Sequence, residues 1–248
     1  QGCLPPVVMD NLLEWVTALM TISAKEKWTR DRPGSREQVP RFFQAQEVEV
    51  LLPAQRIRLG PQVWPQGKPG ERDGPAVTRR AADAVLEAAG RPPLSPGEEL
   101  LWHGAPENVA RIIAQDGFDV TKSKRSFVGQ AVYFSENITK ADEYAGDTEV
   151  KTVLLCRVVV GKLAYCPATP DADGSRALRH QCRKGTSGSI MLDRVPERGT
   201  FREWAVLDGA RGQPEFLVRY RASRVRLPPR LTARSGSGNR PDPVGTGE

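Results

Sequence analysis

The chain has 248 residues, of which 36 are basic, 30 are acidic, 39% are hydrophobic and only two are histidine. This length suits one domain of average size with an appendage. The hydrophobic share and the mixed charges exclude wholesale disorder, collagen-like repeats and coiled coils. Because no apolar run reaches about 18 residues, we expect no membrane span.

The net charge of +6 is concentrated near the C-terminal end of the sequence. Residues 221–248 contain six Arg against one Asp and one Glu, whereas the preceding part is nearly neutral. From residue 227 onward the sequence also lacks apolar periodicity. We therefore predict a disordered basic tail over residues 226–248 and allow nucleic-acid binding only through this tail.

The cysteines and histidines do not form the spacing of a metal site. The four cysteines are far apart and contain no Cys-x-x-Cys pair, and the neighbours His180 and Cys182 are interpreted as a chance pair in a loop. We expect no metal, and we expect reduced thiols in an intracellular protein of the cytoplasm or nucleus. Any targeting signal before Gln1 would be missing from this sequence.

The N-terminal third is predicted to contain two helices and a strand pair. Residues 9–27 have apolar side chains at helical spacing, which predicts an amphipathic helix docked on the body in preference to a membrane-surface helix. Residues 48–59 alternate like a strand pair interrupted at Pro53. After a loop rich in Gly and Pro, residues 75–90 predict a helix that ends at Gly90. We divide the chain into this first helix (1–27), a catalytic domain (28–225) and the tail (226–248).

The rest of the chain alternates short strands and helices. Residues 98–102 predict a strand, and residues 106–117 a helix with Val109, Ile112 and Ile113 on its apolar face. Further strands are predicted at 131–136, 150–166, 200–209 and 215–222, with a short helix at 137–146 and a loop at 167–189. This pattern indicates an α+β domain with a mostly antiparallel or mixed sheet.

Several common chemistries find no support in the sequence. It contains no G-x-x-x-x-G-K-[ST], no G-x-G-x-x-G after a strand and no H-E-x-x-H motif. Hydrolysis by a Ser-His-Asp triad needs a histidine base, but neither His103 nor His180 lies near a G-x-S-x-G elbow. With so few histidines, the position of His103 gains importance. It closes a predicted strand and precedes Gly104, a place suited to a polar ligand, although a histidine satisfied within a turn is the alternative.

Two tyrosines and one glutamate are further candidates. Tyr133 and Tyr144 lie on a predicted strand and the following helix, where their rings could form a slot for a flat heteroaromatic ring or simply pack in the core. Glu203 lies in an apolar strand and must find partners or shift its pKa. It is either a functional carboxylate or the ion-pair partner of Arg202 or Arg219.

Taken together, these residues resemble the catalytic domain of the poly(ADP-ribose) polymerase (PARP) family. The resemblance rests, in order and spacing, on LLWHGAPENVARIIAQDGFD, VGQAVYFSENITKADEYA, LLCRVVVGK, GTFREWAVLD and PEFLVRYR, and its specific part is the His-Tyr-Glu set. It covers about residues 28–221. It implies an ADP-ribosyltransferase fold, in which two small packed mixed or antiparallel sheets with flanking helices enclose a cleft for the co-substrate NAD+.

The resemblance also implies a role for each candidate residue. His103 would bind an NAD+ ribose hydroxyl, and the Gly104 backbone would hold the nicotinamide carboxamide. Tyr133 and Tyr144 would sandwich the nicotinamide ring, and Glu203 would bind the ribose 2′-hydroxyl. Glu203, His103 and Tyr133 are thus the expected catalytic set.

Three positions depart from the family pattern. Ala105 follows His-Gly, where the family has Ser or Thr. Ala141 replaces a Ser that donates to the carboxamide oxygen, and Ala131 replaces a Gly before the strand tyrosine. Each of the first two changes removes a neutral hydrogen bond worth about 0.5–1.5 kcal/mol. We expect weaker NAD+ binding at an otherwise intact site.

The implied activity is transfer of single ADP-ribose units from NAD+ to an acceptor, most simply a protein. Glu203 is compatible with polymer formation, yet many relatives that have this residue transfer one unit. A silent NAD+-binding module and an NAD+ glycohydrolase are the alternatives.

The loop over residues 121–127, with Lys122, Lys124 and Arg125, would border the cleft and meet the pyrophosphate, or remain a solvated basic loop.

Overall fold

The computed structural model describes residues 6–24, 42–51, 74–123, 126–185, 188–194 and 201–223, with side chains from residue 11 onward. The predicted tail, the strand expected after Pro53, and the basic residues Lys124 and Arg125 lie outside these ranges. None of the described helices is long and apolar enough to cross a membrane.

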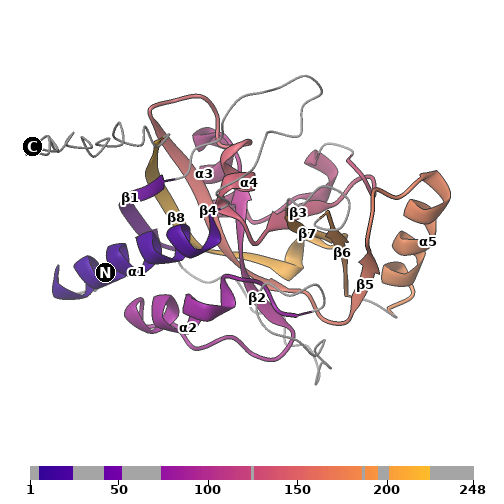
Figure 1. Ribbon diagram of the computed structural model, residues 1–248, viewed down its shortest axis with the longest axis horizontal. Coiled ribbons are helices and arrows are strands. Elements are labelled where there is room, and N and C mark those ends of the chain that lie inside the picture. The colour runs from indigo at the N-terminus through magenta and orange to yellow at the C-terminus, as the bar shows by residue number, and fades with distance from the viewer. Residues whose placement is uncertain are drawn as a thin grey trace, which may run out of the picture.

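The described chain folds into helices and strands that alternate along the sequence (Figure 1). The helices are α1 (Pro6–Ser23), α2 (Arg79–Ala88), α3 (Glu107–Asp116), α4 (Ile138–Asp142) and α5 (Ala172–Arg183), with 3-10 turns at Val120–Lys122 and Gly209–Arg211. The strands are β1 (Phe42–Val50), β2 (Glu98–Gly104), β3 (Val132–Ser135), β4 (Val150–Val159), β5 (Leu163–Cys166), β6 (Ser189–Asp193), β7 (Arg202–Val206) and β8 (Gly212–Ser223).

The strands form a mixed sheet with the order β1-β8-β4-β2-β3-β7-β6-β5. Neighbouring strands are antiparallel except for β5 and β6, which are parallel. The sheet consists of two four-stranded halves, because β2 and β3 pair only at Trp102 and Ser135. The two small sheets expected from the sequence are therefore present as halves that meet at one residue pair.

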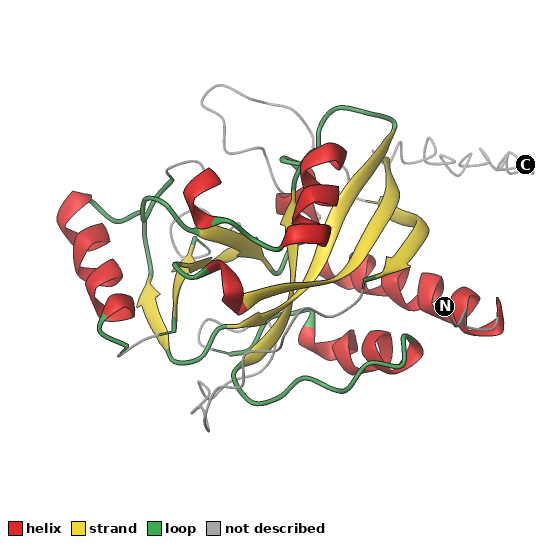
Figure 2. Ribbon diagram, turned by 180° about the vertical axis from the view of Figure 1, so that it is seen from behind, coloured by secondary structure: helices red, strands yellow, loops and turns green. Residues whose placement is uncertain are grey.

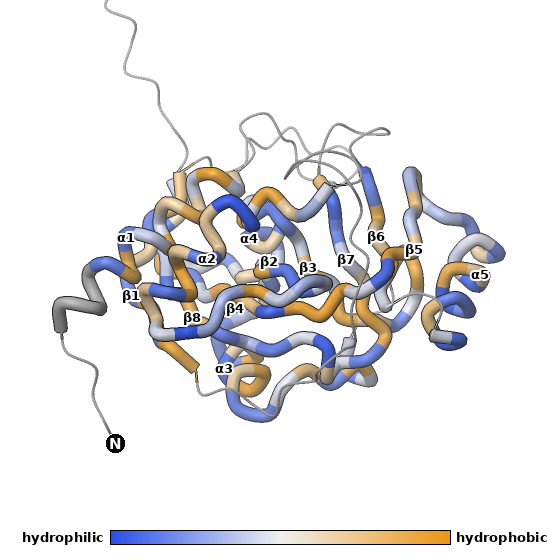
Figure 3. The backbone as a smooth tube through the Cα atoms, turned by 90° about the horizontal axis from the view of Figure 1, so that it is seen from below, coloured by the Kyte–Doolittle hydropathy of each residue, from blue (hydrophilic) through white to orange (hydrophobic). Residues whose placement is uncertain are grey.

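Both faces of the first half-sheet are covered. Side chains of β4 alternate between the two faces, with Val153 and Leu155 in the core beneath α1, α2 and α4, and Leu154 and Cys156 in the core beneath α3. Figure 3 shows α3 on one side of these strands and α1, α2 and α4 on the opposite side. This double burial explains why four consecutive residues of β4, from Val153 to Cys156, are apolar.

The second half-sheet has its own apolar cluster, where β5, β6 and β7 meet α5. Ala164, Ile190 and Ala205 are buried there, and Leu178 and Cys182 of α5 pack against them. Figure 2 shows α5 at the end of the molecule opposite α1. The cysteines Cys156, Cys166 and Cys182 are free thiols.

Most predicted elements are confirmed, with small changes in their bounds. The first helix buries Leu12, Val16 and Leu19, and the helix predicted over 75–90 is α2, followed by Gly90 at φ +64. Strand β1 begins at Phe42, six residues before the predicted start at Val48. The strands predicted at 98–102, 131–136, 200–209 and 215–222 are β2, β3, β7 and β8.

The long strand predicted over residues 150–166 is wrong, because it is two strands. The chain leaves β4 after Val159 and turns at Gly161, whose φ of +57 is readily adopted only by glycine. It then forms β5, which joins the opposite edge of the sheet beside β6. The turn could not be predicted from hydrophobic periodicity, because apolar residues stand on both sides of it.

The loop predicted over residues 167–189 is also wrong. Residues Ala172–Arg183 form α5, and the Asp171 carboxylate caps its N-terminus by accepting from Gly174 N at 2.7 Å. His180 and Cys182 thus lie on a helix. Strand β6, whose five residues are all buried, follows at Ser189 and was not predicted.

The predicted apolar face of α3 is only partly correct. Val109 and Ile112 are exposed, whereas Ala110 is buried and Ile113 is half-buried. The helix turns its smaller side chains toward β4 and β8, because alanine lets the helix axis approach the sheet closely. The prediction counted only large apolar residues.

Candidate functional site

The site lies where the two half-sheets separate. Beyond the Trp102–Ser135 pair, β2 continues through His103 and Gly104, which pair with Leu154 and Val153 of β4. On the other side, Tyr133 of β3 pairs with Ala205, and Ser135 pairs with Glu203 of β7. The strand ends that carry His103, Gly104 and Tyr133 therefore lie on the two sides of this split, and Glu203 lies on the next strand.

His103 is fixed by a hydrogen bond across the split. Its Nδ1 lies 2.9 Å from the carbonyl oxygen of Tyr133, which can only accept, so Nδ1 carries the proton. The ring contacts Phe118 edge-on, with centroids 4.9 Å apart, and also lies against Phe134. Burial lowers the pKa of His103, although the bond to Tyr133 acts in the opposite direction. A neutral ring with Nδ1 engaged leaves Nε2 as an acceptor for a hydroxyl group.

Gly104 is required by close packing against α4. A Cβ atom at this position would lie 1.9 Å from the carbonyl oxygen of Ala141, so only glycine fits. The sequence argument ascribed Gly104 to ligand approach, and the structure adds this second reason. Ala105 and Ala141 themselves are buried at this junction.

Tyr133 is held at both ends. Its carbonyl accepts from His103, and its hydroxyl donates to Gly129 O at 2.7 Å and accepts from Val128 N at 3.3 Å. Burial raises the pKa of Tyr133 to about 12, and the nearby Glu203 carboxylate adds to this effect. The ring is half-buried and remains a neutral phenol over the physiological pH range.

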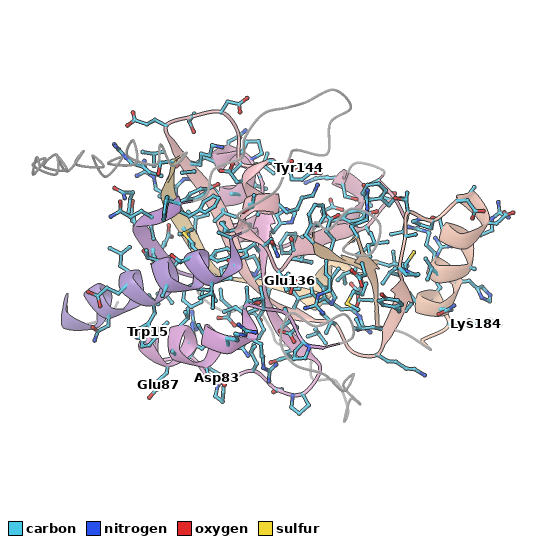
Figure 4. The ribbon with its side chains drawn as sticks, in the orientation of Figure 1. Trp15, Asp83, Glu87, Glu136, Tyr144 and Lys184 are labelled. Atoms are coloured by element: carbon cyan, nitrogen blue, oxygen red, sulfur yellow. The ribbon has the colours of Figure 1, made fainter. Side chains whose placement is uncertain are left out.

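Tyr144 follows α4 and is 55% exposed. Figure 4 shows it near the edge of the molecule, whereas Glu136 lies in the interior. The Nζ of Lys140 lies 5.1 Å from the centroid of the Tyr144 ring. A second flat surface is thus available beside the split, and it is more open to solvent than Tyr133.

Glu203 is a buried carboxylate with only 5% of its surface exposed. It acts electrostatically on both Tyr133 and Lys140. The two arginines considered as its partners bind other carboxylates: Arg202 makes a bidentate pair with Glu136, at 2.8 and 2.6 Å, and Arg219 binds Glu47 at 3.1 Å. Its electrostatic effect on Tyr133 and Lys140 associates Glu203 with the residues of the split.

Lys140 is a site residue that the sequence argument missed. Its Nζ binds Glu143 at 2.9 Å and lies 4.7 Å from the centroid of the Phe201 ring. Burial lowers the pKa of Lys140, but Glu203, Tyr144 and Glu143 outweigh burial and raise it overall. The ammonium group stays charged. A lysine four residues before a candidate tyrosine, on the short helix that precedes this tyrosine, was the available signal.

Helix α4 is anchored to the first half-sheet through Asp142. The Asp142 carboxylate accepts hydrogen bonds from Tyr220 of β8 and Lys151 of β4, both at 2.9 Å. This anchor fixes a helix of five residues that would not be stable alone. It thereby sets the positions of Lys140, Ala141 and Tyr144 relative to Gly104.

One comparison with known proteins decides the family. The profile described as "Poly(ADP-ribose) polymerase catalytic domain" matches residues 76–221, which is more than half of the chain. The chain belongs to the PARP catalytic-domain family. A comparison with curated proteins returned no match.

Membership in the PARP family identifies the fold and the general chemistry. The two joined half-sheets with their helices are the ADP-ribosyltransferase fold, and the PARP domain binds NAD+ as its substrate. Helix α1 and strand β1 lie outside the matched range, yet both contribute to the core beneath α2 and α4.

The loop before Tyr133 is partly described in this PARP domain. Lys122 is exposed and lies 3.7 Å from Asp119, and Lys124 and Arg125 fall outside the described residues. Ser126–Gln130 form a tight turn in which Gly129 N donates to Ser126 O at 2.8 Å. Within the described ranges, no group of three His, Cys, Asp or Glu side chains could hold a metal ion.

Proposed function

We propose that the protein transfers single ADP-ribose units from NAD+ to a protein acceptor and releases nicotinamide. The observation that carries this proposal is the buried Glu203 carboxylate, placed beside Lys140 and Tyr133 where the half-sheets separate. A buried carboxylate costs free energy and is retained where charge is needed.

The residues around the split suit the binding of NAD+. The Nε2 of His103 can accept a hydrogen bond from a ribose hydroxyl, since Nδ1 is already engaged. The backbone of Gly104 supplies donor and acceptor groups for the carboxamide. The Tyr133 ring offers a fixed surface for the nicotinamide, and the exposed Tyr144 ring offers the second one.

In the reaction, the bond between C1′ of the ribose and the nicotinamide nitrogen breaks. The bonding electron pair leaves with nicotinamide, which becomes neutral, and positive charge develops on the ribose. The Glu203 carboxylate stabilises this charge, and the acceptor attacks C1′ with its own electron pair, so that a hydroxyl or amine acceptor releases its proton to solvent. The charged Lys140 ammonium group interacts electrostatically with Glu203 beside the reacting ribose.

Incubation of the protein with adenylate-labelled NAD+ tests the proposal. Label on protein indicates a transferase, free labelled ADP-ribose indicates a glycohydrolase, and unchanged NAD+ indicates a binding module. A discrete gel shift rather than a ladder marks single units. The silent module is the second candidate, favoured by the alanines at positions 105 and 141, which lack the hydroxyl donors of the family pattern.

Glu203→Gln should reduce the transfer rate by about 10²–10³-fold, because it removes one preorganised charge from the reacting ribose. Glu143→Gln is the matched control, since it removes the other carboxylate near Lys140 and should keep most activity. Both variants are compared by initial rate at saturating NAD+, after thermal melts show that they fold. Full activity in Glu203→Gln would contradict the assignment.

A further inference from the structure

Helix α5 is hydrogen-bonded to the loop before Tyr133 through Arg179. The Nη1 of Arg179 donates to Val128 O at 2.8 Å and to Gln130 O at 2.9 Å. The helix lies beyond β5 and β6, at the end of the molecule opposite α1 (Figure 1). Arg179 thus connects a peripheral helix to a loop that is about 50 residues earlier in the chain.

The loop is shaped to receive this arginine. Gly129, between the two bound carbonyls, has a φ of +80 and lacks a side chain toward Arg179; a Cβ there would lie 3.3 Å from Nη1. The carbonyl between these two, Gly129 O, accepts from the Tyr133 hydroxyl at 2.7 Å. Three consecutive carbonyl groups are therefore bound, two by Arg179 and one by Tyr133.

The same turn fixes the end of the Tyr133 ring. The hydroxyl of Tyr133 donates to Gly129 O and accepts from Val128 N, so its position depends on the conformation of the turn. Arg179 is also near enough to the hydroxyl to act electrostatically on it. Guanidinium groups stay charged at all accessible pH values, so these contacts persist.

We infer that Arg179 is a positioning residue that orders the turn Ser126–Gln130 and thereby holds the Tyr133 ring in place for NAD+. This inference rests on the proposed function, in which Tyr133 binds the nicotinamide ring. Arg179 binds carbonyl groups of the turn, and the inference gives it no part in the chemical step. Its loss should therefore weaken NAD+ binding more than it slows turnover.

The test compares Arg179→Ala with Arg176→Ala. Arg176 lies on the same helix, pairs with Asp173 at 3.0 Å and is exposed, so its removal takes the same charge from α5 without touching the turn. We expect Arg179→Ala to raise KM for NAD+ about tenfold, which corresponds to about 1.4 kcal/mol, with kcat changed less than KM. Arg176→Ala should leave both constants unchanged.

A double-mutant cycle with Tyr133→Phe separates this role from a general loss of stability. Tyr133→Phe removes the hydroxyl that binds Gly129 O, so its effect on KM should be non-additive with that of Arg179→Ala. Additive effects would contradict a shared turn. Amide hydrogen exchange of Val128 and Gly129, measured without NAD+, should be faster in Arg179→Ala than in Arg176→Ala.

The outcomes distinguish this inference from the proposed function. If wild-type protein shows neither NAD+ binding nor turnover, the proposed function fails, whereas faster exchange in Arg179→Ala still supports an ordering role. If Arg179→Ala matches Arg176→Ala in exchange, the inference is overturned. Faster exchange with an unchanged KM would overturn it as well, because order in the turn would then not matter for NAD+.

Discussion

The alanine at position 141 is the clearest place where a single residue is expected to limit NAD+ binding. Ala141 is buried, and its carbonyl packs against Gly104, whose backbone is proposed to hold the carboxamide. A hydroxyl at this position would lie on the segment that contacts the proposed carboxamide site. Its absence leaves the carboxamide with the backbone of Gly104 as its main proposed partner.

We predict that Ala141→Ser tightens NAD+ binding by about two- to tenfold, the range given by one neutral hydrogen bond. Isothermal titration measures the dissociation constant directly. Ala145→Ser is the control, since it adds the same hydroxyl to a buried alanine of the same segment and should not tighten binding. Equal affinities of Ala141→Ser and the wild type would contradict the prediction.

Sequence reasoning proposed those candidate residues whose chemistry is unusual for their surroundings. His103 and Glu203 are polar groups in apolar strands, and such groups can be recognised without coordinates. Lys140 was missed because a lysine on a short helix normally lies in solvent, and only the fold shows it buried beside Glu203. The need for glycine at 104 was predicted for one reason and has a second, the carbonyl of Ala141.

At the scale of elements, strands and helices were predicted correctly where glycine or proline marks their ends. Gly90 and Gly117 both have positive φ and mark the ends of α2 and α3 as expected. The prediction failed between residues 150 and 189, where apolar residues continue across Gly161 and where α5 is composed mainly of small, polar and basic residues. Helix α5 has few large apolar residues because only one side meets β5 and β6.

Helix α1 lies outside the matched family range but is connected to the strand that carries His103. Leu12, Val16 and Leu19 are buried in the core shared with β2 and β8. In addition, Trp102 Nε1 donates to Ser23 Oγ at 3.0 Å, which ties the last turn of α1 to β2. These contacts indicate that α1 unfolds together with the rest of the domain.

We predict that Leu19→Ala lowers the free energy of unfolding by about 2–5 kcal/mol, since Leu19 is fully buried. Glu14→Ala, at an exposed position of the same helix, should change it by less than about 0.5 kcal/mol. Urea denaturation followed by circular dichroism measures both. A stable Leu19→Ala variant with a single unchanged transition would show that α1 does not belong to the cooperative unit.

At the scale of the whole molecule, the stability of the fold should depend on pH through Glu99. This glutamate of β2 is completely buried, and its charged neighbours are Arg79, Arg202 and Glu136. Burial raises the pKa of Glu99 to about 8, although Arg79 and Arg202 act in the opposite direction. The folded protein thus retains a proton that the unfolded chain loses near pH 4.5.

The sign of the effect follows from this difference in proton binding. Between about pH 4.5 and 8 the folded state binds more protons than the unfolded state, so the free energy of unfolding falls as the pH rises through this window. Glu99→Gln keeps a neutral side chain of similar size at every pH. It should therefore remove the contribution of Glu99 to this decline.

We predict that the advantage of Glu99→Gln over wild type in Tm is larger at pH 8 than at pH 5, by at least about 4 °C. Thermal melts at the two pH values measure this difference. Glu87→Gln, which changes an exposed carboxylate of α2, is the control and should show the same small shift at both. If Glu99 were instead ionised and paired with Arg202, Glu99→Gln would be less stable than wild type at pH 8, and the prediction would fail.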